Sequence, residues 1–126
     1  MARILVAEDE EDIRELIAFA LTNLRDFEVI SVSNGVEALE KARTESPDLI
    51  ILDVKMPSLS GYDVCIELKG SKKTANIPVV FLSARGQEAE IKEGLEVGGL
   101  EYILKPFAPE DLCKRVTRIL REHNAL

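Results

Sequence analysis

The sequence lacks several features that would place it in a large class of proteins. No apolar run approaches the ~20 residues that cross a bilayer, and Met1–Arg3 leads directly into Ile4–Val6 with no signal-peptide layout. We therefore expect a cytoplasmic protein with no membrane contact. No stretch is rich enough in Pro, Gly or Ser to form a linker, and no internal repeat or low-complexity segment occurs.

Clusters of positive charge are also missing. The 16 Lys and Arg residues are scattered among 23 Asp and Glu residues, and the net charge is −7. Binding to nucleic-acid phosphates needs clustered Lys and Arg side chains. We therefore expect no direct contact between this chain and a nucleic acid.

Cysteine and histidine are scarce as well. Cys65 and Cys113 form no CxxC motif and have no histidine near them in the sequence, so neither a disulfide framework nor a zinc site is predicted. We expect two buried free thiols, as is common for free cysteine. The single histidine, His123, lies near the C-terminus and is not expected to bind a metal. No Gly-rich turn follows the first apolar run, which argues against a dinucleotide site.

Apolar runs alternate with helical patterns five times along the chain. Three of the apolar runs are continuous, which is typical of parallel strands covered on both faces. The first helical pattern is a one-sided apolar stripe that needs a sheet to cover it; its members are Ile13, Leu16, Ile17, Ala20, Leu21 and Leu24. The second helix should begin after Ser33 or Asn34 as N-cap and end before Pro47. The expected strands are Ile4–Ala7, Val29–Val32, Leu49–Val54, Val79–Leu82 and Tyr102–Leu104, and the remaining helices are Gly61–Lys69, Gln87–Val97 and Pro109–Glu122.

This alternation predicts an α/β fold with a parallel sheet and the element order (βα)5. The length of 126 residues is that of one ordinary domain, which buries roughly two-thirds of the surface of its unfolded chain. We therefore expect one domain over residues 1–126.

Polar residues follow four of the expected strands. Glu8 and Asp9 follow the first, Asp53 lies at the end of the third, Ser83 follows the fourth and Lys105 follows the fifth. The carboxyl ends of parallel strands meet at one edge of a sheet, which is where open α/β sheets bind ligands. The next acids, Glu10–Asp12, are expected to be the solvated start of the first helix, because acids favour its positive end.

Three carboxylates beside one ammonium would leave a local charge of about −2. Two like charges about 4 Å apart repel by roughly 4 kcal/mol at an effective dielectric constant near 20, so the cluster must hold protons or recruit a divalent metal. Oxygen ligands favour Mg²⁺ or Mn²⁺ over zinc. With the charge neutralised, one carboxylate can act as a nucleophile toward phosphorus, while Lys105 and the Ser83 hydroxyl hold oxygens of the incoming phosphoryl group.

These residues stand in a recognisable series of motifs over the whole chain. The series is Ile-Leu-Val-Ala-Glu-Asp-Glu (4–10), Asp-Val-Lys-Met-Pro (53–57) with Gly61, Ser-Ala (83–84), and Tyr102 three residues before Lys-Pro-Phe (105–107). It resembles the receiver domain of two-component response regulators, and is similar to the single-domain chemotaxis-type regulators. The resemblance implies a flavodoxin-like doubly wound sheet with strand order 2-1-3-4-5.

The resemblance also implies a chemistry. Asp53 would accept a phosphoryl group from a sensor histidine kinase or a histidine phosphotransfer protein. Asp9, Asp53 and the main-chain carbonyl of Lys55 would coordinate Mg²⁺, with Glu8 in the outer acidic position. Ser83 and Lys105 would contact the phosphoryl oxygens.

The same resemblance implies a switch. Ser83 would move toward the new phosphoryl group and Tyr102 would turn inward behind it, remodelling the face formed by the fourth helix, the fifth strand and the fifth helix. That face would signal to a downstream protein, which the sequence does not identify, and a phosphorylation-dependent dimer stays open. A cis Lys105–Pro106 peptide is also implied.

Some positions depart from the family's common pattern. Glu8 stands where Asp is frequent, Ser83 stands where Thr is also common, and Gly99-Leu100 replaces a more usual Ala and polar residue. Lys55 and Arg85 each lie two residues beyond a site residue, at positions that flank the phosphoryl group in receivers. Two cations there would shield the group from water, and we therefore hypothesise a long-lived aspartyl phosphate.

Two alternatives remain beside a phosphorylated signalling module that is not a multiple-turnover enzyme. The chain can be a receiver domain cut from a longer regulator, or one that acts by phosphorylation-independent protein binding. A small phosphohydrolase with an aspartate nucleophile is disfavoured, because such an enzyme usually has a second acid two residues after the nucleophile and Lys55 occupies that place.

Overall fold

Five parallel strands alternate with five helices in the computed structural model, which describes residues 1–126. The strand order is β2-β1-β3-β4-β5, and every pairing is parallel. This confirms the predicted (βα)5 flavodoxin-like fold. The strands are β1 (Arg3–Ala7), β2 (Glu28–Val32), β3 (Leu49–Asp53), β4 (Val79–Ser83) and β5 (Glu101–Leu104). The helices are α1 (Glu11–Arg25), α2 (Gly35–Glu45), α3 (Gly61–Lys69), α4 (Glu88–Glu96) and α5 (Pro109–Glu122).

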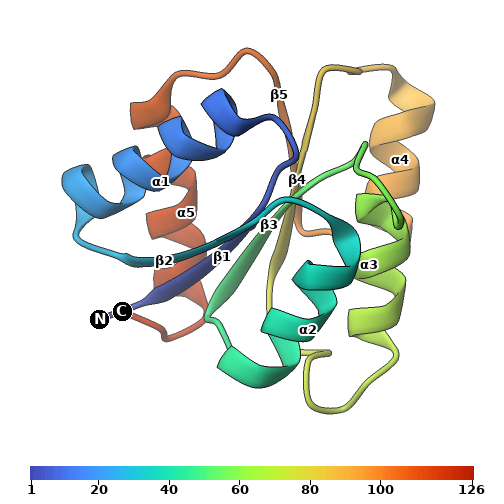
Figure 1. The fold of residues 1–126 in the computed structure, drawn as a ribbon, viewed down its shortest axis with the longest axis horizontal. Helices are drawn as coiled ribbons and strands as arrows, with labels where there is room; N and C mark the ends of the chain where they lie inside the picture. Colours follow the sequence, from blue (N-terminus) through green and yellow to red (C-terminus); the bar gives the residue numbers. More distant parts are fainter.

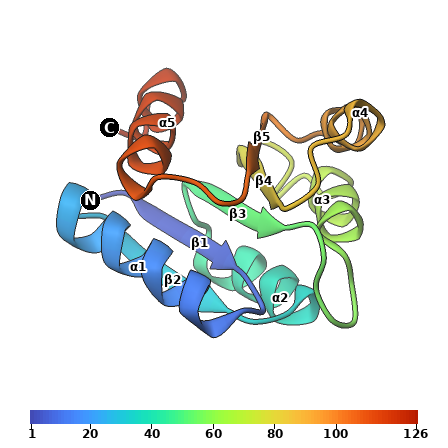
Figure 2. The ribbon, with the colours of Figure 1, turned by 90° about the horizontal axis from the view of Figure 1, so that it is seen from above.

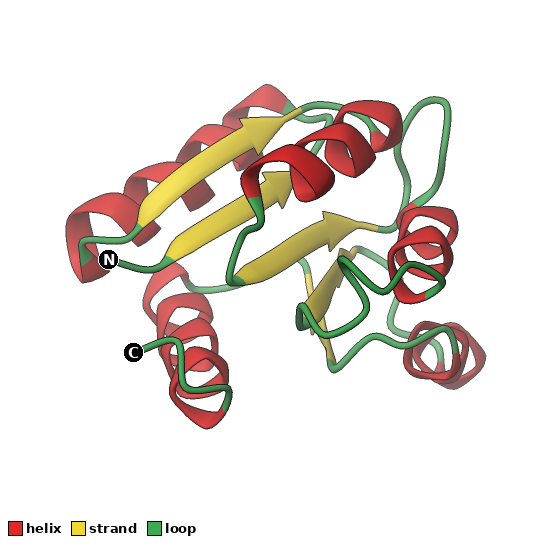
Figure 3. Cartoon of the chain, turned by 90° about the horizontal axis from the view of Figure 1, so that it is seen from below, coloured by secondary structure: helices red, strands yellow, loops and turns green.

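The helices cover both faces of the sheet (Figures 1 and 3). Helices α1 and α5 lie on one side, and α2, α3 and α4 lie on the other. Successive side chains of a strand point to opposite faces, so each central strand contributes to two cores. In β1, for example, Ile4 and Val6 pack into the core beneath α1 and α5, while Leu5 and Ala7 pack into the core beneath α2 and α3.

Both cysteines are free and buried, as expected, and they lie on opposite sides of the sheet. Cys113 of α5 belongs to the core beneath α1 and α5, and Cys65 of α3 belongs to the other core. None of the helices combines the length and the apolar composition that a membrane span needs.

Local signals explain where the helices begin. Of the two N-cap candidates for α2, the structure uses Asn34, whose side chain accepts a hydrogen bond from the Glu37 N–H. Helix α3 begins with a capping box, in which Ser60 and Asp63 each bond the other's backbone N–H. Such caps satisfy backbone donors that the first turn of a helix leaves free.

The predicted apolar stripe of α1 is only partly covered by the sheet. Ile17, Ala20 and Leu21 are buried, whereas Leu16 and Leu24 are 45% and 44% exposed. The prediction that the whole stripe packs inward was therefore wrong at its margins, because Leu16 lies at the edge of the stripe and Leu24 lies in the last turn.

Candidate functional site

The carboxyl ends of β1, β3, β4 and β5 meet at one edge of the sheet, where the arrowheads of β1 and β3 point in the same direction (Figure 2). The register places the functional side chains beside one another. Ala7 pairs with Leu52, so Glu8 follows beside Asp53, and Asp53 in turn pairs with Leu82, the neighbour of Ser83. A cavity of about 800 Å³ opens at this edge. Its lining includes Asp9, Asp53, Lys55, Ser83, Arg85 and Lys105.

The loop after β3 is fixed close to Asp53. The Gly61 N–H donates to the carbonyl oxygen of Val54 over 2.8 Å. A Cβ atom on Gly61 would lie only 2.4 Å from the carbonyl oxygen of Asp53, so no residue with a side chain fits there without a backbone shift. The start of α3 is therefore packed directly against the backbone of Asp53.

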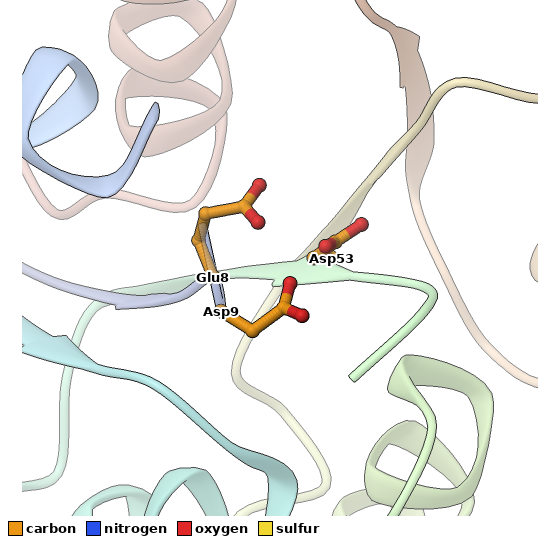
Figure 4. Close-up of side chains that lie close together, drawn as sticks. All are labelled: Glu8, Asp9 and Asp53. Atoms are coloured by element: carbon orange, nitrogen blue, oxygen red, sulfur yellow. The ribbon is translucent and has the colours of Figure 1, made fainter. Parts of the chain in front are cut away.

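Three carboxylates gather at the edge, as the strand ends predicted. One oxygen each of Glu8, Asp9 and Asp53 lie within 4.8 Å of one another. Figure 4 shows Glu8 and Asp9 one above the other on the same side of Asp53, with both carboxylates turned toward it. Glu8 is fully buried and Asp53 is 4% exposed, whereas Asp9 is open to solvent. A cation entering from the cavity would therefore meet Asp9 and Asp53, with Glu8 behind them.

Lys105 supplies the positive charge at the centre of the site. Its Nζ lies 2.7 Å from Glu8 Oε1 and 3.3 Å from Asp53 Oδ2. The contact with the fully buried Glu8 carboxylate is the shorter of the two, so Glu8 and Lys105 form a tight buried ion pair. The peptide bond that follows this lysine, Lys105–Pro106, is cis, as the resemblance implied.

Glu10 is exposed at the N-cap of α1, as expected for a solvated helix start, and it also borders the site. Its Oε1 lies 3.7 Å from Lys105 Nζ, and the residue lines the cavity. This second role was not predicted; it follows because Glu10 belongs to the loop at the sheet edge.

One lysine does not balance the acidic cluster. Burial, and next the neighbouring Glu8, raise the pKa of Asp53 from 3.8 to about 7. Burial alone would lower the pKa of Lys105, but Glu8 and Asp53 raise it above its ordinary value. Three carboxylate side chains thus face a single ammonium group. A cluster of carboxylate oxygens with too little positive charge beside it suits a hard divalent cation such as Mg²⁺.

Ser83 and Tyr102 are linked through the backbone of one residue, Arg85. Ser83, which is 6% exposed, accepts a hydrogen bond at Oγ from the Arg85 N–H over 3.0 Å. Tyr102 is half-buried, and its hydroxyl donates to the carbonyl oxygen of Arg85 over 3.2 Å. The side chains of Lys55 and Arg85 are exposed at the mouth of the cavity.

Tyr62 lines the same cavity and was not found from the sequence. Its hydroxyl lies 3.3 Å from the hydroxyl of Tyr102, so the two tyrosines of the chain meet at this site. The available signal was its position next to Gly61, at the start of the helix that follows Asp53. That signal is weak, because an aromatic residue in a first helical turn is usually a packing residue.

Comparisons with known proteins agree with these features. Residues 4–117 match the family described as "Response regulator receiver domain". The probable transcriptional regulator ycf27 of Pyropia yezoensis is 44% identical over 119 residues, which are 94% of this chain and 47% of that protein. The alkaline phosphatase synthesis transcriptional regulatory protein PhoP of Bacillus subtilis (strain 168) is also 44% identical over 119 residues, 94% of this chain and 48% of PhoP. The chain thus spans about half the length of the curated relatives it matches.

Solved structures show the same fold. The chemotaxis response regulator CheY4 of Vibrio cholerae superposes with a TM-score of 0.89 at 32% identity, covering 95% of this chain and 99% of that one. The BeF3-activated DrrB receiver domain gives a TM-score of 0.87 at 30% identity, covering 96% and 98% of the two chains.

Proposed function

Because the chain belongs to the response regulator receiver domain family, we propose that Asp53 accepts a phosphoryl group from a phosphohistidine. The donor is a sensor histidine kinase or a histidine phosphotransfer protein. The phosphorus–nitrogen bond of the donor breaks, a bond forms between phosphorus and a carboxylate oxygen of Asp53, and the imidazole is released. The chain takes up one phosphoryl group and acts as a signalling module rather than as a multiple-turnover enzyme.

The observation that carries this proposal is the position of Asp53 between Lys105 and an open cavity. The carboxylate ends β3, is nearly buried, and lies 3.3 Å from the Lys105 ammonium. A phosphoryl group entering the cavity would meet the carboxylate as nucleophile, with Lys105 and the Ser83 hydroxyl on the same edge to hold its oxygens. Phosphoryl transfer depends chiefly on such positioning and charge stabilisation.

The acidic cluster is the proposed magnesium site. Asp9, Asp53 and the main-chain carbonyl of Lys55 would hold Mg²⁺, or Mn²⁺ in its place, and Glu8 would stay in the outer position against Lys105. When bound, the cation neutralises the cluster and the charge of the incoming phosphoryl group. Asp53 is then free to be ionised, which its nucleophilic role requires.

The response to phosphorylation is proposed to run through Ser83 and Tyr102 to the face of α4, β5 and α5. A downstream protein would bind that face, and a phosphorylation-dependent dimer through it is one form of output. The named relatives are transcriptional regulators about twice as long as this chain. Output through a further domain of a longer regulator, or binding without phosphorylation, are therefore the alternatives.

Intact mass spectrometry tests the proposal. The protein is incubated with acetyl phosphate in Mg²⁺ or in chelator, beside Asp53→Asn and Asp12→Asn, an exposed acid outside the site. We expect one phosphoryl adduct per chain in Mg²⁺, absent in chelator and in Asp53→Asn, and retained in Asp12→Asn. An adduct that survives in Asp53→Asn would refute the assignment of the nucleophile. Steady release of phosphate over many equivalents would favour a phosphohydrolase instead.

A further inference from the structure

The two tyrosine hydroxyls make three hydrogen-bond contacts but have only two protons to donate. Each hydroxyl has one proton to donate. Tyr62 donates to the carbonyl oxygen of Glu90, in the first turn of α4, over 2.8 Å. The proton of Tyr102 then has two acceptors at nearly equal distance, the carbonyl oxygen of Arg85 at 3.2 Å and the hydroxyl oxygen of Tyr62 at 3.3 Å. Tyr102 can therefore bond to the loop after β4 or, through Tyr62, to α4.

Tyr62 is held rigidly on its support. It follows Gly61, which is packed against the Asp53 backbone, and the capping box of Ser60 and Asp63 fixes the same turn. Its ring meets the ring of Phe81 edge to face, with centroids 5.1 Å apart and planes at 81°. Burial, and next the hydrogen bond with Tyr102, raise the pKa of Tyr62 above its usual range. The hydroxyl therefore stays protonated as a donor to α4.

The other acceptor of the Tyr102 proton, the carbonyl oxygen of Arg85, is less firmly fixed than Tyr62. The backbone of Arg85 is held on both sides of its Cα: its N–H donates to the Ser83 hydroxyl, and its carbonyl oxygen accepts from the Tyr102 hydroxyl. If Ser83 is drawn toward a phosphoryl group on Asp53, the Arg85 N–H loses its acceptor. The bond from Tyr102 to the Arg85 carbonyl weakens when the backbone of Arg85 moves, whereas the Tyr62 oxygen remains in place.

Helix α4 packs directly against the ring of Tyr102, so a movement of the ring is transmitted to the helix. A Cβ atom on Gly94 would lie 3.0 Å from Tyr102 Cδ2, so the tyrosine ring rests against the helix at a position without a side chain. The helix thus meets Tyr102 at Gly94 and Tyr62 at Glu90, one turn apart on the same helix.

We propose that Tyr62 is a positioning residue, whose hydroxyl accepts the hydrogen bond of Tyr102 when the backbone of Arg85 moves and fixes the first turn of α4 through Glu90. A chain of hydrogen bonds then runs from Tyr102 through Tyr62 to α4, and the hydrogen bonds in such a chain strengthen one another. The trigger rests on the proposed phosphorylation of Asp53. The link from Tyr62 to α4 exists without it.

Nuclear magnetic resonance of Tyr62→Phe tests this inference, because the substitution removes the hydroxyl and keeps the ring on Phe81. Backbone amide spectra are recorded before and after addition of beryllium fluoride and Mg²⁺, which mimic the phosphoryl group. We expect amides near Ser83 and Lys105 to respond as in the wild type, and the response of amides 90–94 to fall to less than half. The control Ile66→Ala changes an exposed residue of α3, the helix that carries Tyr62, and it should respond like the wild type.

Hydrogen exchange in the free protein separates this inference from the proposed function. Loss of one hydrogen bond should speed exchange of amides 90–94 in Tyr62→Phe by roughly 2- to 12-fold. A full α4 response to beryllium fluoride in Tyr62→Phe would overturn the inference, and so would unchanged exchange. If the wild type shows no response near Asp53 at all, the proposed function fails, and the exchange rates alone decide the role of Tyr62.

Discussion

Replacing Asp53 by Asn should stabilise the metal-free protein at neutral pH. The Asp53 carboxylate is nearly buried beside Glu8, and its pKa of about 7 compares with 3.8 for an ordinary aspartate. At about 1.36 kcal/mol for each pH unit, ionising Asp53 in the folded state costs about 4 kcal/mol more than in the unfolded chain. Asn has the same shape without the charge, so it avoids this cost.

The effect should depend on pH in a defined direction. Between pH 3.8 and about 7 the folded wild type holds a proton on Asp53 that the unfolded chain has lost. The contribution of Asp53 to stability therefore falls as the pH rises through this window, and it is lowest above it. The advantage of Asp53→Asn should be near zero at pH 4 and reach about 2 to 4 kcal/mol at pH 8.

Urea unfolding followed by circular dichroism measures this difference. Wild type, Asp53→Asn and the exposed control Asp12→Asn are compared at several pH values in chelator. The dependence of the free energy of unfolding on urea concentration should be the same for all three proteins. Asp12→Asn should lie within about 0.5 kcal/mol of the wild type. Added Mg²⁺ should stabilise the wild type far more than Asp53→Asn. The reasoning is refuted if Asp53→Asn is no more stable than the wild type at pH 8 in chelator.

Three further changes give separate tests. Lys105→Met leaves buried carboxylates without a cation, so unfolding at pH 8 should become easier by about 3 kcal/mol, and equal stability in urea titrations would contradict the ion-pair geometry. Gly61→Ala should cost about 1 to 3 kcal/mol in thermal unfolding, because the new Cβ meets the carbonyl oxygen of Asp53 at 2.4 Å; no loss would show that this turn yields easily. Lys55→Ala with Arg85→Ala should shorten the lifetime of the aspartyl phosphate several-fold in a phosphate-release assay, and an unaltered rate would dismiss the shielding hypothesis.

The strands and helices could be predicted closely because their signals are local. The apolar runs placed each strand within one residue of its observed bounds, and α3 and α5 begin and end where expected. The exposure of Leu16 and Leu24 could not be predicted in the same way. Periodicity gives the apolar face of α1, but it does not show how much of that face the sheet covers.

The candidate site was partly predictable for a similar reason. Glu8, Asp53 and Lys105 meet because parallel strand ends share an edge, which the sequence order already implies. Tyr62 depends instead on how α3 and α4 pack over β4 and β5, since its partners are 28 and 40 residues away in sequence. No local pattern encodes such a contact. The roles of the site residues in metal binding and phosphoryl transfer remain predictions.

The placement of the two cysteines offers a way to observe each half of the molecule separately. Cys65 and Cys113 are fully buried, and burial raises the pKa of both thiols, so a thiol reagent reaches either one only after its surroundings open. One thiol lies on each side of the sheet. Their labelling rates therefore measure two opening equilibria in the same chain, and peptide mapping tells them apart. If a phosphoryl mimic slows labelling at Cys65 more than at Cys113, the layer beneath α2 and α3 has been tightened selectively.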